Sequence, residues 1–303
     1  MTVGVLLMAY GTPATPDDVE AYYTHVRRGR PPTPEQLDDL VRRYDAIGGT
    51  SPLLARTRAQ ADGVQRALDA AEPGRFVVEL GMKHAPPFVE DGVARLRQAG
   101  VATAVGLVLA PHYSALSVGE YVERARAAAG DDLAVEFIEH WHELPGYLDA
   151  LASRVKEALA TFPDPDAVAV VFTAHSLPAR ILESGDPYPE QLQATAQAVA
   201  ARAGVAGWSV AWQSAGRTPE PWIGPGLHEA LQALADAGST AVLVCPAGFV
   251  SDHLEVLYDL DVEARRQAVE LGLAFARTAS LNDDPQLCAA LAGLVLRRAG
   301  RGN

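Results

Sequence analysis

The sequence predicts an α/β protein with parallel β-sheets, arranged as two related halves. Two observations support this prediction. Short apolar runs of about five to seven residues recur along the chain, and segments with apolar residues at helical spacing lie between them. A strand that is covered on both faces has a continuous run of apolar residues, whereas a helix that covers a sheet has apolar residues along one stripe. The alternation of the two patterns therefore indicates strands and helices in turn.

The expected strands are rich in Val, Leu and Phe. In chain order they cover Val3–Ala9, Phe76–Leu80, Ala104–Ala110, Ala134–Ile138, Ala167–Thr173, Trp208–Trp212 and Ala241–Cys245. The clearest expected helices cover Leu53–Ala70, Pro87–Ala99, Pro145–Ala160, Tyr188–Ala203 and Gly226–Ala237. Seven or eight strands make two sets of about four. We expect a first half over residues 1–145 and a second over residues 146–303, with the C-terminal helix packing back on the first.

Composition disfavours several classes of protein. The formal net charge of -13 opposes binding to nucleic acid, because the chain would bring its own negative charge against phosphates. Two cysteines cannot supply the four ligands of a typical iron–sulfur cluster, and they favour a reduced, cytoplasmic setting. The apolar N-terminal run lacks the basic flank and cleavage site of a signal peptide. No run reaches the roughly 18 apolar residues of a membrane helix.

Histidines gather near the ends of the expected strands. In open α/β sheets, ligands bind beyond the carboxyl ends of the strands. Six of the eight histidines lie in or near such positions, namely His84, His112, His140, His142, His175 and His253. This placement indicates a functional site at that edge.

His175 stands just after the strand Ala167–Thr173, in the segment FTAHSLP. A neutral imidazole at this place can bind a metal or accept a proton near neutral pH. The structural alternative is a histidine hydrogen-bonded to a neighbouring carbonyl at the strand end, with Ser176 capping a turn. The residues alone leave both interpretations open.

Three carboxylates form an acidic stripe, because Glu255, Asp259 and Glu263 are spaced at i, i+4 and i+8. On an α-helix this stripe drifts by roughly 40° per step, and a widened π-type turn would align it better. Three like charges repel one another, and a divalent cation or a row of hydrated ions would offset the repulsion. The alternatives are a capping box from Asp252 to Glu255 and a solvated helix face.

Five arginines gather in the N-terminal part of this acidic chain, at positions 27, 28, 30, 42 and 43. Arginine favours bidentate pairing with carboxylates, although a solvated helix face is the usual fate of a charge run. The chain has no phosphate loop, dinucleotide fingerprint, nucleophile elbow or regular zinc-ligand spacing. Enzymes built on those motifs are therefore disfavoured.

Eight ordered segments between residues 6 and 261 together resemble the ferrochelatase family. They are LLMAYGTP, YYTHVRRGRPP, RYDAIGGTSPL, LAPHYSALSVGEY, TAHSLP, SGDPYPEQL, WQSAGRTPEPWIGP and PAGFVSDHLEVLYDLD. The resemblance is strongest to the Gram-positive type that metallates coproporphyrin III. It implies two Rossmann-like, chelatase-like domains with an active-site cleft between them. It also implies a lyase of heme biosynthesis that inserts Fe²⁺ into coproporphyrin III, gives Fe-coproporphyrin III (coproheme) and releases two protons.

The resemblance assigns roles to individual residues. His175 and Glu255 match the catalytic pair that faces the metal, and Asp259 and Glu263 continue a stripe that carries metal ions or protons. The substrate-binding positions are Tyr10, Arg27, Arg43, Tyr44, Ser51 and Tyr121. Sequence leaves open which of His175 and Glu255 is the base and which guides the metal, from which side iron arrives, and the oligomeric state.

Further expectations concern cofactors and partners. We expect Fe²⁺ as a substrate, no prosthetic group, and an auxiliary divalent metal at the acidic stripe. Some family members carry a [2Fe–2S] cluster on a C-terminal extension, and we expect none here because only Cys288 lies near Asn303. The expected partners are porphyrin and iron, without nucleic acid or stable membrane insertion. We expect a monomer with transient contact with heme-pathway enzymes.

Three alternative functions stay open at this point. The chain could be a protoporphyrin IX ferrochelatase, because physics alone does not separate the two porphyrins. It could be a non-catalytic tetrapyrrole- or metal-binding protein. It could be a chelatase for sirohydrochlorin or a cobalt corrinoid, although those enzymes usually rely on a pair of histidines and the acidic stripe at Glu255 argues against them.

Overall fold

The computed structural model describes residues 2–216 and 218–300. Within them the chain forms eight strands in two four-stranded sheets, and every pairing of neighbouring strands is parallel. The expected α/β fold with parallel sheets flanked by helices is therefore confirmed. The outer limits of the expected halves, residues 1 and 303, and Arg217 of the WQSAGRTPEPWIGP segment lie outside the described residues.

The two sheets have the same strand order. The first runs β2-β1-β3-β4, with β1 at Val3–Ala9, β2 at Phe76–Met82, β3 at Thr103–Val108 and β4 at Ala134–Ile138. The second runs β6-β5-β7-β8, with β5 at Ala169–His175, β6 at Trp208–Gln213, β7 at Ala241–Cys245 and β8 at Ala274–Arg277. In each sheet the strand that comes first in sequence is a central strand, so the residue that follows it emerges in the middle of the sheet edge.

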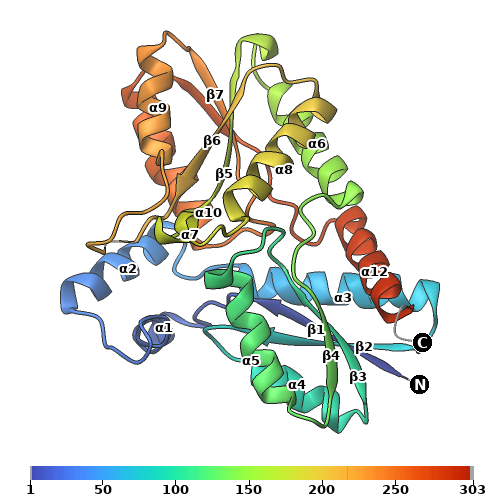
Figure 1. Ribbon diagram of the computed structural model, residues 1–303. Coiled ribbons are helices and arrows are strands. Elements are labelled where there is room, and N and C mark those ends of the chain that lie inside the picture. The colour runs from blue at the N-terminus through green and yellow to red at the C-terminus, as the bar shows by residue number, and fades with distance from the viewer. Residues whose placement is uncertain (1, 217, 301–303) are drawn as a thin grey trace.

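Helices cover both faces of the two sheets (Figure 1). The α-helices are α1 Val19–Val26, α2 Pro34–Ala46, α3 Leu53–Ala71, α4 Val89–Gln98, α5 Glu120–Ala129, α6 Pro145–Leu159, α7 Arg180–Glu183, α8 Tyr188–Ala203, α9 Leu227–Asp236, α10 Leu254–Tyr258, α11 Arg265–Glu270 and α12 Pro285–Gly300. Short 3-10 helices cover Pro16–Asp18 and Pro165–Ala167. Two segments are π-helices, η2 at Ala115–Gly119 and η4 at Asp259–Ala264.

Strand β1 shows why the apolar runs are continuous. Val5 and Leu7 belong to one hydrophobic cluster, Leu6 and Met8 to another, and all four side chains are fully buried. Because alternate residues of a strand face opposite sides of the sheet, each face of β1 needs apolar side chains. The same reasoning holds for β5, where Val170 and Val171 lie in different clusters.

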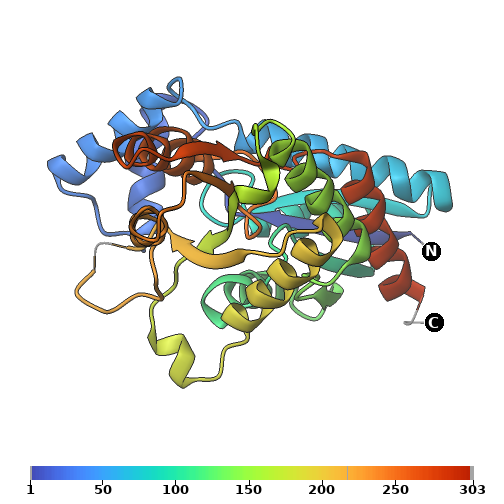
Figure 2. The same cartoon turned by 90° about the horizontal axis from the view of Figure 1, so that it is seen from above.

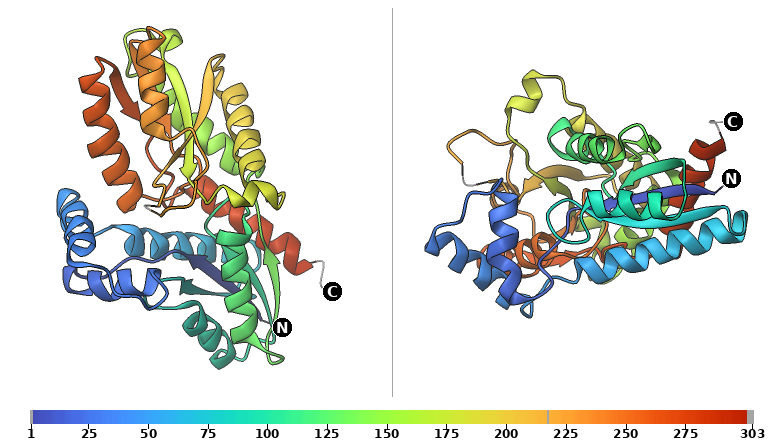
Figure 3. Two further views of the ribbon diagram at one scale, coloured as in Figure 1. Left: turned by 60° about the vertical axis from the view of Figure 1, so that its left-hand side comes forward. Right: turned by 90° about the horizontal axis from the view of Figure 1, so that it is seen from below.

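The C-terminal helix α12 joins the halves. It packs against α3 of the first half and α6 of the second, and it lies across their junction in Figures 1 and 3. The helices approach closely at Gly63 of α3, where a Cβ atom would stand 2.6 Å from the Cys288 Sγ atom. A second junction is formed by α2, which lies beside α10 (Figures 1 and 2).

Differences from the expected elements are small. The strand expected at Ala167–Thr173 begins at Ala169 and continues to His175, which places the histidine at the last strand position. Strand β8 has only four residues, none of them fully buried, because it forms the edge of its sheet. It therefore lacks the long apolar run that marks a central strand. No helix in the described part of the chain combines the length and apolar character needed to cross a membrane.

Candidate functional site

A cavity of about 760 Å³ opens between the two sheets, at the carboxyl ends of their central strands. Tyr10 follows β1, Lys83 and His84 follow β2, and His175 ends β5. Both halves supply walls of the cavity, as expected for a site between two parallel sheets. Of the sequence-predicted site residues, Tyr10, Tyr44, Ser51, Tyr121, His175 and Glu255 line it.

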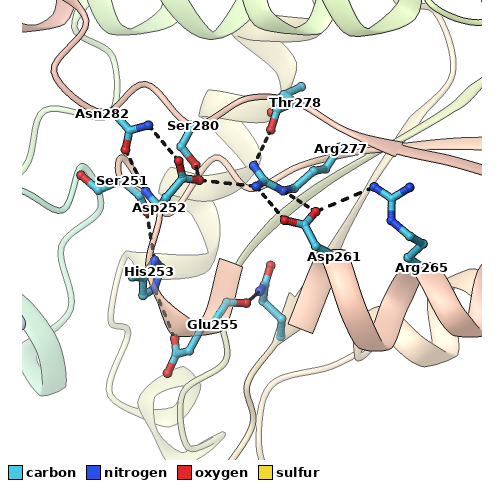
Figure 4. A network of polar contacts seen from close by, with 11 residues as sticks. Ser251, Asp252, His253, Glu255, Asp261, Arg265, Arg277, Thr278, Ser280 and Asn282 are labelled. Atoms are coloured by element: carbon cyan, nitrogen blue, oxygen red, sulfur yellow. Dashed lines mark hydrogen bonds and ion pairs between the residues drawn. The ribbon is translucent and has the colours of Figure 1, made fainter. Parts of the chain in front are cut away.

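His175 and Glu255 are brought together by the strand order of the second sheet. His175 ends β5, Glu255 lies in α10 after the neighbouring strand β7, and the His175 Nε2 atom is 3.5 Å from Glu255 Oε1. The side chains are 33% and 34% exposed, so both are open to a ligand in the cavity. His253 Nε2 stands 3.8 Å from the other carboxylate oxygen, Oε2. Figure 4 shows His253 and Glu255 side by side.

His175 and Glu255 strongly shift each other's pKa. Burial lowers the pKa of His175, but the charge and hydrogen bond of Glu255, the Ser176 carbonyl and the charge of Asp259 together outweigh this and raise the pKa to about 9. Burial raises the pKa of Glu255, but His175 and His253 together hold it well below its usual range. At neutral pH these shifts favour an imidazolium paired with a carboxylate. A metal ion that binds the His175 Nε2 atom must displace its proton.

Backbone contacts orient the imidazole of His175. Its Nδ1–H donates to the backbone carbonyl of Ser176, which leaves Nε2 directed at Glu255. The Tyr188 hydroxyl donates to the backbone carbonyl of His175 at 3.0 Å. The hydrogen bond to a neighbouring carbonyl, expected as the structural alternative, is present, and the second ring nitrogen lies 3.5 Å from Glu255 Oε1 at the cavity wall.

The acidic stripe runs from Glu255 out of the cavity. Asp259 begins the π-helix η4, so the widened turn that would align the carboxylates is present. Burial and the charge of Glu255 raise the pKa of Asp259 to about 6, and the Ser214 hydroxyl donates to its carboxylate. Within residues 2–216 and 218–300, no three His, Cys, Asp or Glu side chains come together closely enough to hold a metal ion.

The capping-box alternative for Asp252 and Glu255 is wrong. Helix α10 begins after His253, which makes no side-chain cap. The Asp252 carboxylate instead accepts hydrogen bonds from Ser280 and Asn282 on a distant loop, at 2.8 and 2.9 Å. Glu255 is therefore free to face His175.

The two predicted substrate arginines are placed differently from the other substrate residues. Arg43 points from α2 toward the second half, where its Nη1 atom is 4.0 Å from Asp259 and its guanidinium lies over the Tyr258 ring at 5.1 Å. Arg27 donates from Nε to the Arg30 carbonyl at 3.2 Å. Neither is among the residues that line the cavity, whereas the neighbouring Arg28 is.

Several cavity residues were not assigned a role from sequence. Lys83, whose side chain is 8% exposed, forms an ion pair with Glu120, and His84 packs on Tyr10 with ring centroids 4.6 Å apart. Burial lowers the pKa of His84 to about 3, so this ring is neutral and aromatic at physiological pH. Their position directly after β2 was the available signal. That position did not predict the ion-pair partner of Lys83, because Glu120 is far away in sequence.

A buried contact fastens the halves beside the cavity. The Asp186 carboxylate accepts hydrogen bonds from the Ser114 hydroxyl at 2.9 Å and from the Ala115 backbone at 2.8 Å. It also accepts one from the Tyr188 backbone at 3.1 Å. The Tyr188 hydroxyl also donates to the His175 carbonyl. This junction therefore connects the first half with the residue that helps to orient His175.

The arrangement suits a flat ligand with anionic edges. Aromatic rings of Tyr10, Tyr44 and Tyr121 line the first-half wall, and basic side chains of Arg28 and Arg124 lie at the same wall. The His175–Glu255 pair stands on the second-half wall and can exchange a proton for a metal ion. Chemically, the cavity can present a metal to one face of a planar ring.

Comparisons with known proteins agree with this geometry. The family model described as "Ferrochelatase" matches residues 2–299. A coproporphyrin III ferrochelatase from Geobacillus thermodenitrificans is 46% identical, over 99% of this chain and 97% of that protein. A coproporphyrin III ferrochelatase from Bacillus subtilis is 43% identical, over 99% of this chain and 98% of that protein.

Among solved structures, the sirohydrochlorin chelatase SirB from Bacillus subtilis subspecies spizizenii, in complex with cobalt, has a TM-score of 0.58. It is 12% identical over 99% of this chain and 96% of that chain. At this identity the likeness shows the fold alone, and it confirms the expected chelatase-like pair of Rossmann-like units.

We expect Glu255→Gln to shift the titration of His175. Without the carboxylate charge, burial outweighs the remaining partners, so the pKa of His175 falls from about 9 toward or below its ordinary value of about 6.5. The imidazolium then loses its proton at lower pH. Imidazole NMR resonances followed over pH measure this shift. Glu263→Gln, in the same stripe, is the matched control. An unmoved His175 midpoint in Glu255→Gln contradicts the pairing.

Proposed function

The chain belongs to the ferrochelatase family, and we propose that it inserts ferrous iron into coproporphyrin III, giving Fe-coproporphyrin III (coproheme) in heme biosynthesis. Family membership makes it an enzyme and a lyase. The observation that carries the proposal is the His175–Glu255 pair, 3.5 Å apart at the wall of a 760 Å³ cavity. The coproporphyrin III specificity is supported by relatives of that name at 43% and 46% identity.

Insertion exchanges protons for a metal without any change of oxidation state. Two pyrrole N–H bonds break, Fe²⁺ forms bonds to the ring nitrogens, and two protons leave. Contacts at the edges of the macrocycle can hold it bent, which favours the transition state over the flat ring. His175 and Glu255 then serve as ligands of the incoming iron and as acceptors of pyrrole protons.

The charge of the pair sets the order of these events. Before iron arrives, the proton is on His175 and Glu255 is ionised. Glu255 can therefore attract the cation at once, whereas His175 becomes a ligand or a base only after it has lost a proton. Asp259 and Glu263 continue from Glu255 and carry metal ions or protons along the helix. An auxiliary divalent metal bound at this stripe belongs to the same proposal.

Six residues form the proposed substrate site: Tyr10, Arg27, Arg43, Tyr44, Ser51 and Tyr121. The place of Tyr10, Tyr44, Ser51 and Tyr121 in the cavity wall supports their part. The two arginines are proposed as propionate partners on their chemistry. For Arg43 this requires that its guanidinium leave Asp259, with which it is in contact at 4.0 Å.

The cellular setting belongs to the same proposal. We propose a cytoplasmic monomer without an iron–sulfur cluster, which meets porphyrin and iron and contacts heme-pathway enzymes transiently. Cys245 and Cys288 are free and buried, as suits a reducing compartment. We place the division between the two domains after residue 145, at the start of α6.

An anaerobic insertion assay tests the substrate. We expect rapid insertion of Fe²⁺ into coproporphyrin III and slow insertion into protoporphyrin IX, followed by absorbance of the metallated ring. A preference for protoporphyrin IX would overturn the substrate and keep the enzyme class. Porphyrin binding without insertion of Fe²⁺ or Zn²⁺ would instead identify a non-catalytic binding protein.

We expect His175→Ala to abolish insertion and to leave porphyrin affinity largely unchanged. The variant loses the group that exchanges its proton for the metal, and general acid–base groups contribute about 10²- to 10⁴-fold to rates. The insertion rate and the quenching of porphyrin fluorescence measure the two effects separately. His228→Ala, at an exposed histidine of α9, is the control. Normal insertion by His175→Ala removes the central residue from the mechanism.

A further inference from the structure

A polar network lies behind the helix that carries Glu255, and its centre is Arg277 (Figure 4). Arg277 is the last residue of β8, at the edge of the second sheet. Its guanidinium pairs with both oxygens of Asp261, with Nε–Oδ1 at 2.8 Å and Nη2–Oδ2 at 2.9 Å. The same Nη2 atom is 3.5 Å from Oδ1 of Asp252.

The network is partly buried, with the Asp261 side chain 32% exposed, and its polar groups are well paired. The side chains of Arg277 and Asp252 are 14% and 18% exposed. Asp252 also accepts hydrogen bonds from the Ser280 hydroxyl and the Asn282 amide, and its backbone N–H donates to the Asn282 side chain at 2.9 Å. Because a buried charge is costly unless it is paired, these contacts give the three ions a single arrangement.

Asp252 and Asp261 flank the segment that carries Glu255 and Asp259. Asp252 lies three residues before Glu255, and Asp261 lies two residues after Asp259. Glu255 points away from Arg277 in Figure 4, and Arg277 is not among the residues lining the cavity. Arg277 therefore holds the segment from behind, without contact with the ligand.

The segment between the two carboxylates needs such support. It contains the change from the α-helix α10 to the π-helix η4, and π-turns are rare and are found mostly as single turns at functional sites. A planar guanidinium that binds both oxygens of Asp261 fixes direction as well as distance. Its second contact, to Asp252, ties the start of α10 to the same point.

We propose, on the basis of the function proposed above, that Arg277 is a positioning residue that fixes the spacing of Glu255 and Asp259 and thereby the metal affinity of the site. Groups hydrogen-bonded directly to a metal ligand orient it, and their loss typically costs about 10- to 100-fold in metal affinity or activity. Arg277 acts one step further away, through Asp252 and Asp261, so its loss should have a smaller effect.

The porphyrin wall of the cavity comes largely from the first half. Arg277 bonds Asp252, Asp261 and the Thr278 carbonyl, all in the second half. The network reaches the first half through the Asn282 backbone carbonyl, which accepts a hydrogen bond from Gln60 at 2.8 Å.

Arg277→Gln, Arg277→Lys and a matched control test the proposal. The control is Arg265→Gln, because Arg265 also faces Asp261, at 4.0 Å, but its side chain is 52% exposed and has no contact with Asp252. Zn²⁺ affinity without porphyrin, measured by calorimetry, gives a readout that does not depend on turnover. The KM for Fe²⁺, kcat and porphyrin affinity complete the set.

We expect Arg277→Gln to weaken Zn²⁺ binding and raise the KM for Fe²⁺ by about 10-fold, the lower end of the range for direct partners of a metal ligand, with porphyrin affinity unchanged. Arg277→Lys keeps the charge but not the planar fork, so we expect an intermediate loss, and Arg265→Gln should match the wild type. Unchanged Zn²⁺ affinity in either Arg277 variant overturns the proposal. Equal losses in Arg265→Gln also overturn it.

The two proposals can fail separately. If the wild type binds Zn²⁺ but inserts no metal, the proposed function fails while the role of Arg277 in metal affinity is still measured. Should Arg277→Gln unfold, as circular dichroism would show, the Arg277→Lys result decides.

Discussion

The charge balance between His175 and Glu255 controls what the cavity can bind. Burial disfavours the charged form of each residue, and each supports the charge of the other. Together they form an ion pair across 3.5 Å, with one ring nitrogen of His175 fixed by the Ser176 carbonyl. Such a pair favours an incoming cation through Glu255 and releases a proton from His175 when the cation binds. Proton release and metal binding are therefore coupled at one place.

The parallel topology explains how the pair arises. Strands β5 and β7 are neighbours, so the segments that follow them meet at one edge of the second sheet. The first sheet, with the same strand order, brings Tyr10 and Lys83 to the facing edge. Buried junctions at Asp186 and along α12 connect the two halves, and the cavity lies between the two edges.

Local features of this structure could be predicted from the sequence more completely than contacts between distant residues. Central strands such as β1 and β7 could be predicted because burial on both faces demands apolar runs, and the position of His175 follows from the end of β5. Strand β8 could not be delimited, because an edge strand of four residues needs no such run. The Lys83–Glu120 pair, the contact of Arg43 with Asp259, and the Arg277 network join residues far apart in sequence. No local sequence pattern predicts these contacts. For Asp252, the capping-box spacing was misleading for the same reason, since its partners lie near residue 280.

The most direct measurement is a crystal structure with Zn²⁺ bound in the absence of porphyrin, with the ion located by anomalous scattering. We expect one ion between the His175 Nε2 atom and the Glu255 carboxylate, at ligand distances of about 2.0–2.2 Å. The His175 Nδ1–H would keep its hydrogen bond to Ser176. An ion bound only at Asp259 and Glu263, with His175 and Glu255 still paired to each other, would show that the pair is not the metal site.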